Sequence, residues 1–335
     1  MSSKVLESLN EAHFSQIISS FAEKYGFLPI LNDLKIVPLT GGKSQASLYR
    51  FEMGQQNYVL KLLPTSLNER NHQILLATQA GQIGIAPVIH FVDFQLRALI
   101  MDFIPGRTVH PQDFKNRQLL VNFAQMLRQL HQSSSSFPVA QTPFQRFHQF
   151  LLKGEAQKII YPKQLSDVKK SMEEIEAVLQ QHSVGLTPTH LDLNPLNILL
   201  TDKSFFLVDW SNGGLSDPYF DLATFCVFHG LSDEQKHFFL ALYLEREPTR
   251  LEWSRFVVVQ PVRLFVIAAA FLSLSSEGKI QYEKAILLND FIIQHAERKA
   301  DLSLRQIGLI MLNDGLDLIA GNDFKQTLSF LKDWH

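Results

Sequence analysis

The spacing of apolar and polar positions changes character about one third of the way along the chain. Leu6, Phe14, Ile17 and Phe21 recur at roughly helical spacing, which predicts a helix within the first 30 residues. Three short β-type runs follow, KIVPL, SLYRF and NYVLKLL, separated by GG and MGQQ, so antiparallel hairpins are expected. From Pro111 onward the spacing is mostly helical. The pattern predicts an α+β protein with a small sheet-containing lobe and a larger helical lobe.

The boundary between the two predicted lobes falls after two further strand-like runs. A helix is expected after NYVLKLL, because Ser66 and Glu69 form a capping-box pattern and Gly81 is a plausible C-terminal stop. PVIHFVD and RALIMDFI then complete five β runs, and DFIPG ends the last of them. We therefore expect an N-terminal lobe at residues 1–102 and a C-terminal lobe at residues 103–335.

Composition narrows the class of protein. With 335 residues the chain is too long for one ordinary core, which agrees with two lobes. The formal net charge of −2 argues against a nucleic-acid surface built on bulk positive charge. Cys226 is the single cysteine, so no internal disulfide can form, and a reducing, cytoplasmic location is expected. The first residues mix charges and lack the apolar segment of a signal peptide.

One apolar run, Phe256 to Leu274, approaches the length of a membrane span. Gln260, Pro261 and Arg263 interrupt it. A buried helix of the C-terminal lobe is the favoured interpretation, with a membrane span as the alternative.

The stretch THLDLNPLNILLTDKSFFLVDW, residues 189 to 210, concentrates small polar groups around two strand-like pieces. Asp192 follows His190 by two residues, Asn197 follows Asp192 by five, and Asp209 ends the second strand-like piece. Asn197 and Asp209 carry the oxygen ligands that Mg²⁺ prefers, and Asp192 can orient a hydroxyl and accept its proton. The alternative is that each polar residue only makes turns and caps.

The segments HLDLNPLNILL, FFLVDW and DPYFDLA closely resemble the aminoglycoside phosphotransferase and choline kinase superfamily. These are small-molecule kinases with a protein-kinase-like fold. The resemblance implies Asp192 as the catalytic residue and Asn197 and Asp209 as Mg²⁺ ligands, which should meet in one cleft facing Lys61. His190 is expected to support the loop. Two further aspartates are expected to brace it from either side, Asp217 and Asp221.

The resemblance extends into the N-terminal lobe. Lys61 in NYVLKLL occupies the place of the strand lysine that binds the α- and β-phosphates of ATP, with a solvated strand lysine as the alternative. LTGGKSQASLYRF resembles the loop that covers the phosphates, which implies nucleotide binding by four residues, Gly41, Gly42, Lys43 and Ser44. LIMDFIPG resembles the hinge, which implies that the backbone at Asp102 and Ile104 binds the adenine edge.

Two departures from the family pattern stand out. Relatives often carry a helix glutamate that pairs with the strand lysine, whereas the corresponding position here is Gln73; Glu69, one turn earlier, is the alternative partner of Lys61. Choline-kinase-like members often have an acid after D-W, but this chain continues with Ser211 and Asn212, and an expected acid after DLA is also missing. These departures leave the acceptor molecule open.

The sequence thus predicts an ATP- and Mg²⁺-dependent kinase that phosphorylates a hydroxyl of a small molecule. Amino alcohols such as choline, ethanolamine or thiamine-like compounds are the first expectation, and aminoglycosides or sugars the second. A pseudokinase or nucleotide-binding regulator is the alternative from another class. A protein kinase is disfavoured because only seven residues separate Asp209 from DPYFDLA, which leaves no activation loop. No nucleic-acid partner is expected, and the sequence does not determine the oligomeric state.

Overall fold

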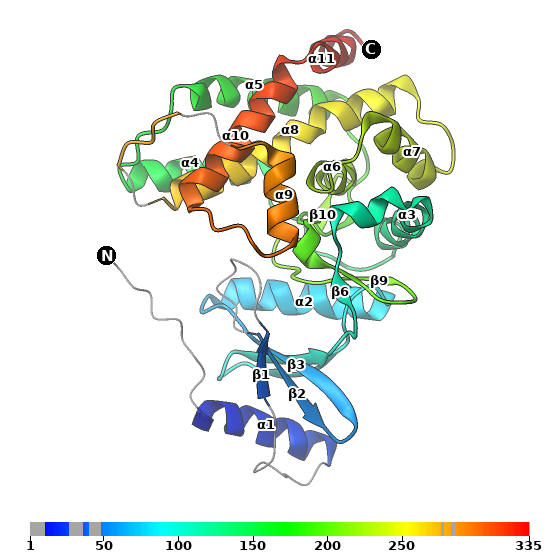
Figure 1. Ribbon diagram of the computed structural model, residues 1–335, viewed down its shortest axis with the longest axis vertical. Helices are drawn as coiled ribbons and strands as arrows, with labels where there is room; N and C mark the ends of the chain where they lie inside the picture. The colour runs from blue at the N-terminus through cyan, green and yellow to red at the C-terminus, as the bar shows by residue number, and fades with distance from the viewer. Residues whose placement is uncertain (1–10, 27–35, 40–47, 276–277, 283–285, 335) are drawn as a thin grey trace. The chain divides into compact units, whose positions relative to one another are not determined.

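The computed structural model describes residues 11–26, 36–39, 48–275, 278–282 and 286–334 (Figure 1). The chain divides into two compact units. Unit 1 comprises Met1–Arg107 and Leu199–Ser211, and unit 2 comprises Thr108–Ile198 and Asn212–His335. Residues 199–211 therefore group with the sheet-containing unit, although they follow much of the helical unit in the sequence.

Unit 1 is built on a five-stranded antiparallel sheet in the order β1-β2-β3-β5-β4. The strands are β1 (Ile36–Leu39), β2 (Leu48–Met53), β3 (Gln56–Leu62), β4 (Ile89–Asp93) and β5 (Ala98–Asp102). A two-residue turn joins β2 to β3, and Gly54 in it has a φ of 64°, a conformation that glycine adopts at little cost. The predicted antiparallel hairpin is confirmed at this point.

Helix α1 (Glu11–Tyr25) covers one face of this sheet. Its residues Phe14, Ile17 and Phe21 pack against Phe51 and Tyr58 of the strands, with Phe51 and Tyr58 stacked at 5.6 Å. The apolar spacing that predicted a helix near the N-terminus is thus the spacing of the face that α1 buries.

Helix α2 (Leu67–Ile83) follows β3; it begins after Ser66, as predicted, but ends later than predicted. The Ser66 side chain accepts a hydrogen bond from the Glu69 N–H, but the reciprocal half of a capping box is absent among the described contacts. The predicted stop at Gly81 is wrong. The helix continues to Gly84, whose φ of 85° places it in the left-handed region that closes a helix.

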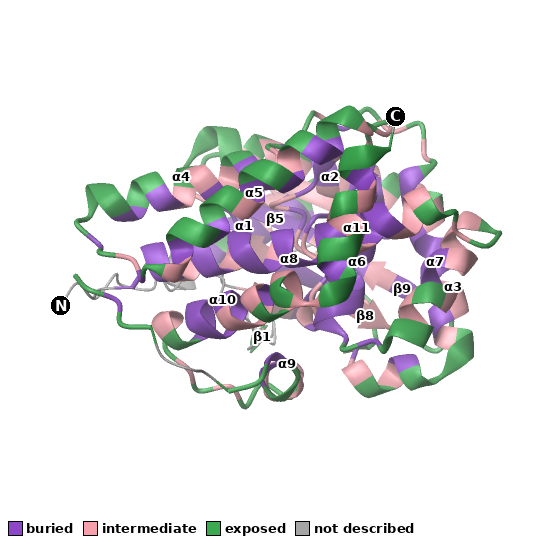
Figure 2. Cartoon of the chain, turned by 90° about the horizontal axis from the view of Figure 1, so that it is seen from above, coloured by how far each residue is buried: buried purple, intermediate pink, exposed green. Residues whose placement is uncertain are grey.

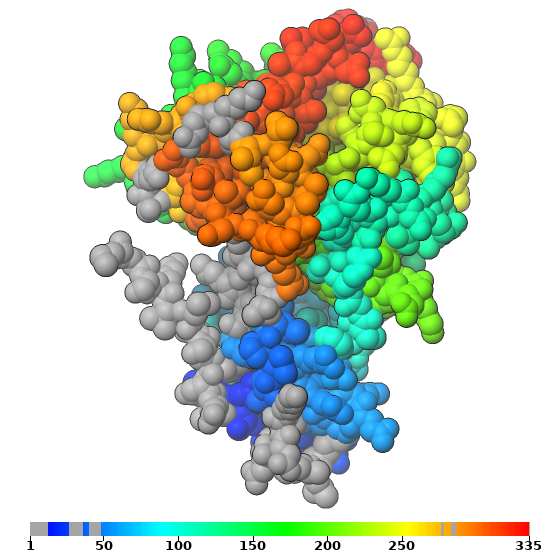
Figure 3. Space-filling model, in the orientation of Figure 1, coloured from blue at the N-terminus to red at the C-terminus, as the bar shows by residue number. Residues whose placement is uncertain are grey.

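Unit 2 is mostly helical. It contains α3 (Arg117–His131), α4 (Pro143–Ala156), α5 (Gln164–Gln181), α6 (Tyr219–Phe228), α7 (Asp233–Leu244), α8 (Arg250–Ser273), α9 (Leu288–Ala296), α10 (Leu304–Ala320) and α11 (Asn322–Asp333), with the 3-10 turns η2 (Pro111–Lys115) and η3 (Pro195–Asn197). In Figure 3 the atoms of α9 and α10, in orange to red, form a continuous part of the visible surface of this unit.

The apolar run from Phe256 belongs to α8, which packs against α4, α6 and α10. Arg250–Ser273 is long and apolar enough to cross a membrane by length and composition, but 72% of its most apolar window is buried within the fold. Figure 2 shows α8 mostly in the colour of buried residues. The interpretation as a buried helix of the C-terminal region therefore agrees with the packing.

Short strands carry the polar motif. β7 (Thr187–Thr189) pairs with β10 (Gly214–Ser216), and β8 (Ile198–Leu200) lies between β6 (Arg107–Thr108) and β9 (Phe205–Leu207). The predicted strand pieces NILL and FFLVDW correspond to β8 and β9. The sequence analysis did not predict β7, which is only three residues long.

Candidate active site

In unit 1 the Nζ of Lys61 lies 3.2 Å from Oδ1 of Asp209. Lys61 lies on β3, and Asp209 follows β9, which is held to unit 1 by a 2.7 Å hydrogen bond from the Leu207 N–H to the Ile85 carbonyl. The side chains of Lys61 and Asp209 are 13% and 29% exposed, so the ion pair is largely shielded but accessible to a small ligand. The alternative that Lys61 is a solvated strand lysine does not hold.

Two motif positions have left-handed backbone conformations that non-glycine residues rarely adopt. Asp209 has a φ of 63°, and Leu191, directly before Asp192, has a φ of 58°. Such conformations cost roughly 1 kcal/mol or more and concentrate at functional sites. Their presence at both ends of the polar motif favours a functional interpretation of the motif over ordinary turn chemistry.

A pocket that is open to solvent lies beside the Lys61–Asp209 pair in unit 1. Its lining combines these two residues with Gln73 and apolar side chains that include Leu99 and Met101. The side-chain oxygen of Gln73 is buried and has no hydrogen-bond partner among the described residues. Gln73 therefore shares a pocket with Lys61, whereas Glu69 is exposed at the start of α2.

The hinge residues predicted to bind adenine lie at the end of β5. The Asp102 N–H donates to the Val88 carbonyl at 3.0 Å, and the Asp102 carboxylate lies 2.6 Å from His90 Nε2, so both groups already have partners. The Ile104 N–H has no partner in the described part of the chain, which leaves it available to an acceptor. Gly41, Gly42, Lys43 and Ser44 lie outside the described residues.

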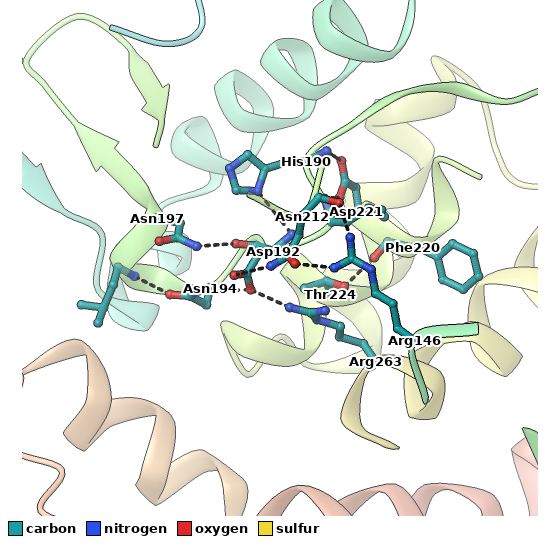
Figure 4. Close-up of polar contacts among 12 residues, drawn as sticks. Arg146, His190, Asp192, Asn194, Asn197, Asn212, Phe220, Asp221, Thr224 and Arg263 are labelled. Carbon is teal, nitrogen blue, oxygen red and sulfur yellow. Dashed lines mark hydrogen bonds and ion pairs between the residues drawn. The ribbon is translucent and has the colours of Figure 1, made fainter. Parts of the chain in front are cut away.

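In unit 2 the loop before η3 presents Asp192 (Figure 4). The loop is held by Asp221 of α6, whose carboxylate is fully buried and accepts the N–H of His190 at 2.8 Å and of Leu191 at 2.7 Å. The buried His131 contacts the same carboxylate at 3.2 Å. His190 is itself buried and accepts the Asp192 N–H on its Nδ1 at 3.3 Å. His190 and Asp221 therefore shape the loop.

Asp217 has a different environment. It is buried, accepts the Tyr219 N–H on Oδ1 at 2.9 Å, and forms an ion pair with Arg255 through Oδ2. The contacts of the Asp217 carboxylate thus hold the start of α6 and α8, whereas Asp221 contacts the loop.

The Asp192 carboxylate is surrounded by hydrogen-bond donors. Oδ1 accepts from Arg263 Nη2 at 2.6 Å and from Asn194 Nδ2 at 3.3 Å, and Oδ2 accepts from Asn212 Nδ2 at 3.3 Å. Burial raises the pKa of Asp192, but the nearby charges of Arg263 and His190 and these hydrogen bonds outweigh burial, so the pKa lies below its ordinary value. Asp192 is therefore an ionised acceptor at neutral pH.

The residues assigned to Mg²⁺ have oxygen atoms of the required kind. The Asn197 Nδ2 donates to the Asp192 carbonyl at 3.0 Å, which leaves the amide oxygen available, and Asp209 offers a partly exposed carboxylate. No group of three or more His, Cys, Asp or Glu in the described part of the chain could hold a metal ion. Each side chain by itself offers an oxygen that suits Mg²⁺, an ion that also takes oxygen ligands from nucleotide phosphates.

No sequence motif marks the two arginines near Asp192. Arg263 of α8 interrupts an apolar run, and a charged residue within a buried helix is itself a signal, because burial requires a partner. Arg146 of α4 contacts Asn212 through both Nη atoms, and no local motif marks it. Helix packing brings both residues to the loop.

Lys61 lies on a strand and Asp192 on a braced loop, as the resemblance to the small-molecule kinases implies. The chain matches the phosphotransferase enzyme family over residues 35–254 and belongs to this family. The predicted enzyme class and family are thereby confirmed.

The curated protein LicA of Haemophilus influenzae is 29% identical over 184 residues, which cover 53% of this chain and 67% of LicA. A choline/ethanolamine kinase family protein from Mesorhizobium loti has a TM-score of 0.73 at 20% identity, covering 94% of this chain and 99% of that protein. Choline kinase LicA from Streptococcus pneumoniae has a TM-score of 0.66 at 17% identity, covering 86% and 98%. LicA in complex with AMP has a TM-score of 0.62 at 14% identity, covering 90% and 99%. These structural likenesses confirm the predicted kinase-like α+β fold.

Proposed function

We propose that this chain transfers the γ-phosphoryl group of ATP, in a Mg²⁺-dependent reaction, to a hydroxyl group of a small molecule. The observation that carries the proposal is the environment of Asp192, an ionised and partly exposed carboxylate on a braced loop, in a chain of the phosphotransferase family. Positioning and charge neutralisation account for most of the catalysis of phosphoryl transfer.

In this reaction the acceptor oxygen forms a bond to the γ-phosphorus while the bond from that phosphorus to the β–γ bridging oxygen breaks. The proton of the acceptor hydroxyl passes to the Asp192 carboxylate, and ADP leaves. A low pKa suits Asp192, because a loose transition state requires little proton removal early and the carboxylate mainly orients the hydroxyl.

Lys61 is proposed to exchange its contact with Asp209 for the α- and β-phosphates. Asp209 and Asn197 are proposed to hold the magnesium ion, which when bound neutralises phosphate charge. The N–H of Ile104 is proposed to donate to adenine, and residues 41–44 are proposed to cover the phosphates. The AMP-bound LicA structure supports a nucleotide site in a protein of this fold.

The acceptor first suggested by the sequence is an amino alcohol, and the names of the M. loti and S. pneumoniae proteins also contain choline or ethanolamine. Aminoglycosides and sugars are the alternatives. We also propose a cytoplasmic location, where Cys226, buried in α6, remains a free thiol.

A nucleotide-binding regulator without turnover is the second candidate. Gln73 favours it, because an amide cannot neutralise Lys61 as a glutamate would. Asp209 compensates the charge of Lys61 instead, which favours the active enzyme.

A screen of hydroxyl compounds with ATP and Mg²⁺ tests the proposal. ADP release and the mass of the product are measured for amino alcohols, aminoglycosides, sugars and hydroxy acids, with Asp192→Asn as the inactive control. We expect an acceptor from at least one class to gain 80 Da, the mass of HPO₃, in a reaction that requires Mg²⁺. Binding of ATP without any product across all four classes would favour the regulator.

A further inference from the structure

A second, small pocket lies in unit 2 beside Asp192. Leu191, which precedes Asp192, and Arg263, which contacts it, both line this pocket. The remaining lining residues are Gln141, Pro143, Arg146, Phe220, Thr224 and Val266. An acceptor whose hydroxyl reaches Asp192 from this side would place the rest of its atoms among these side chains.

The charges of this pocket are unusual for a site that binds an ammonium group. Two arginines line it and no aspartate or glutamate does. Phe220 is the single aromatic residue of the lining, whereas quaternary ammonium groups are usually held by several aromatic faces. A choline or an aminoglycoside would bring positive charge against two guanidinium groups.

Arg146 is only partly charge-compensated, by the nearby Asp192 that Arg263 already contacts. Its Nη atoms donate to the side-chain and main-chain oxygens of Asn212, both neutral, and no carboxylate lies within ion-pair distance among the described residues. Burial, and then the like charge of Arg263, lower the pKa of Arg146 to about 10 against the opposing effect of the Asp192 charge, so the guanidinium remains protonated at neutral pH. Arg146 and Arg263 together bring two positive charges against the single negative charge of Asp192, and an anionic ligand would balance the remaining positive charge.

Both arginines also have an N–H group that makes no hydrogen bond within the described part of the chain. Arg263 contributes Nη2 to Asp192, but its Nε is buried and, like the Nε of Arg146, has no hydrogen-bond partner among the described residues. Figure 4 shows both guanidinium groups approaching Asp192 and Asn212 from the same side. Two such planar donor groups are suited to the oxygens of a carboxylate or a phosphate.

We infer that the acceptor is a small hydroxy acid, an alcohol that also carries a carboxylate or phosphate group, and that Arg146 and Arg263 bind this acidic group while the hydroxyl lies at Asp192. The inference rests on the proposed function and names its substrate class. The contact between Arg263 and Asp192 places the acidic group only a few bonds from the hydroxyl that is phosphorylated.

The test compares acceptors of matched size and different charge, namely glycerate and glycerol 3-phosphate as acids, glycerol as the neutral compound, and ethanolamine and choline as cations. Turnover with Mg·ATP is measured for the wild type and for Arg146→Gln. We expect the wild type to prefer an acid, and the carboxylate and phosphate compounds distinguish the two kinds of acidic group. Arg146→Gln should raise KM for the preferred acid by about 30-fold or more, the loss expected when one partner of a buried charge pair is removed, with a smaller change in kcat.

Arg250→Gln is the matched control, because Arg250 lies on the same helix as Arg263 but is exposed and stacks on Phe330. It should leave KM unchanged. A wild-type preference for ethanolamine or choline would overturn the inference while leaving the kinase proposal intact, as would an unchanged KM in Arg146→Gln. If no acceptor is phosphorylated, calorimetry with glycerate and glycerol 3-phosphate decides. Binding that Arg146→Gln abolishes supports the anion site, and absence of binding overturns it.

Discussion

The Lys61 ammonium group is neutralised by Asp209, and both residues belong to the same compact unit although 148 positions separate them in the sequence. In the arrangement expected from relatives, a glutamate of the following helix would form the ion pair with Lys61. Here the helix residue that lines the pocket is Gln73. The chain thus holds its strand lysine with a residue that is itself expected to bind magnesium. Binding of Mg·ATP should therefore separate the pair, with the lysine passing to the phosphates.

Lys61→Met should lower turnover by about 10² to 10³, the range for loss of one electrostatic contact at a transferring group. The methionine keeps the apolar stem within the pocket but removes the charge that positions phosphate. Steady-state kinetics with saturating acceptor measure the effect. Lys203→Met, on an exposed turn of the same unit, is the control. Equal turnover in Lys61→Met and the wild type would show that the assignment of Lys61 is wrong.

Asp209→Asn should weaken the binding of Mg·ATP by about tenfold or more, the scale of loss known for residues that support metal ligands. Asparagine is preferable to alanine because Asp209 has a φ of 63°, a region that asparagine tolerates better than other residues. The fold should therefore persist, and circular dichroism checks it. Calorimetry of Mg·ATP binding, with the exposed Asp202→Asn as control, measures the effect. Unchanged affinity would argue against a metal ligand at this position.

Gln73→Glu should be tolerated and should keep or raise activity, because a carboxylate in this pocket can pair with Lys61 when Mg·ATP occupies Asp209. The side-chain oxygen of Gln73 is buried and has no hydrogen-bond partner among the described residues. A glutamate has nearly the same shape, so it would place a carboxylate at this position without displacing an existing hydrogen bond of that oxygen. Thermal unfolding and kcat are compared with those of Gln82→Glu, an exposed position of α2. A marked fall in both quantities, absent from the control, would place Gln73 outside the contact range of Lys61.

The sequence predicted the five strands of the unit 1 sheet because each carries its own signal. The hairpin from β2 to β3 has a glycine turn and two apolar runs, and α1 has a complete apolar face. The end of α2 was misplaced because Gly81 and Gly84 are both possible stops, and the choice depends on which glycine takes a left-handed backbone in the fold.

The candidate site was predictable only where its residues lie close in sequence. His190, Asp192 and Asn197 form one local pattern, and their neighbours in the loop are set by that pattern. The other site residues come from three different helices: Arg146, Arg263 and His131. Each is a polar residue within an amphipathic or apolar helix, and such a position does not show which residue it will contact. Only packing determines that Arg263 contacts Asp192 and that His131 contacts Asp221.

The stability of unit 2 should depend on the protonation of His229 in mildly acidic solution. Burial against Phe114 and Phe225 lowers its pKa from 6.5 to about 4, despite a hydrogen bond to the Phe225 carbonyl and the nearby Asp113. The unfolded chain therefore binds a proton that the folded chain excludes. The free energy of unfolding should fall from pH 6.5 to about pH 4, by up to about 3 kcal/mol, and this contribution should then stay constant.

His229→Gln removes this titration. Urea unfolding at several pH values should show a shallower loss of stability between pH 6.5 and 4 in the variant than in the wild type. His237→Gln, at an exposed position of α7, should leave the slope as it is. An identical slope in His229→Gln and the wild type would show that other groups cause the acid sensitivity.

Asp192→Asn should lower phosphorylation by about 10² to 10⁴ while Mg·ATP still binds, because the change removes the acceptor of the hydroxyl proton and keeps the shape of the side chain. The donors around Asp192 sharpen the test. Arg263 loses its only ion-pair partner among the described residues, so the variant should also be less stable, by roughly 1–3 kcal/mol. Urea unfolding measures that loss of stability. Turnover of the variant and the wild type is compared separately, without denaturant and at a temperature at which both proteins are folded. Asp167→Asn, exposed on α5, is the control. Normal phosphorylation by folded Asp192→Asn would exclude Asp192 as the catalytic residue, and the hydrogen bonds that converge on it would then serve only to hold the loop.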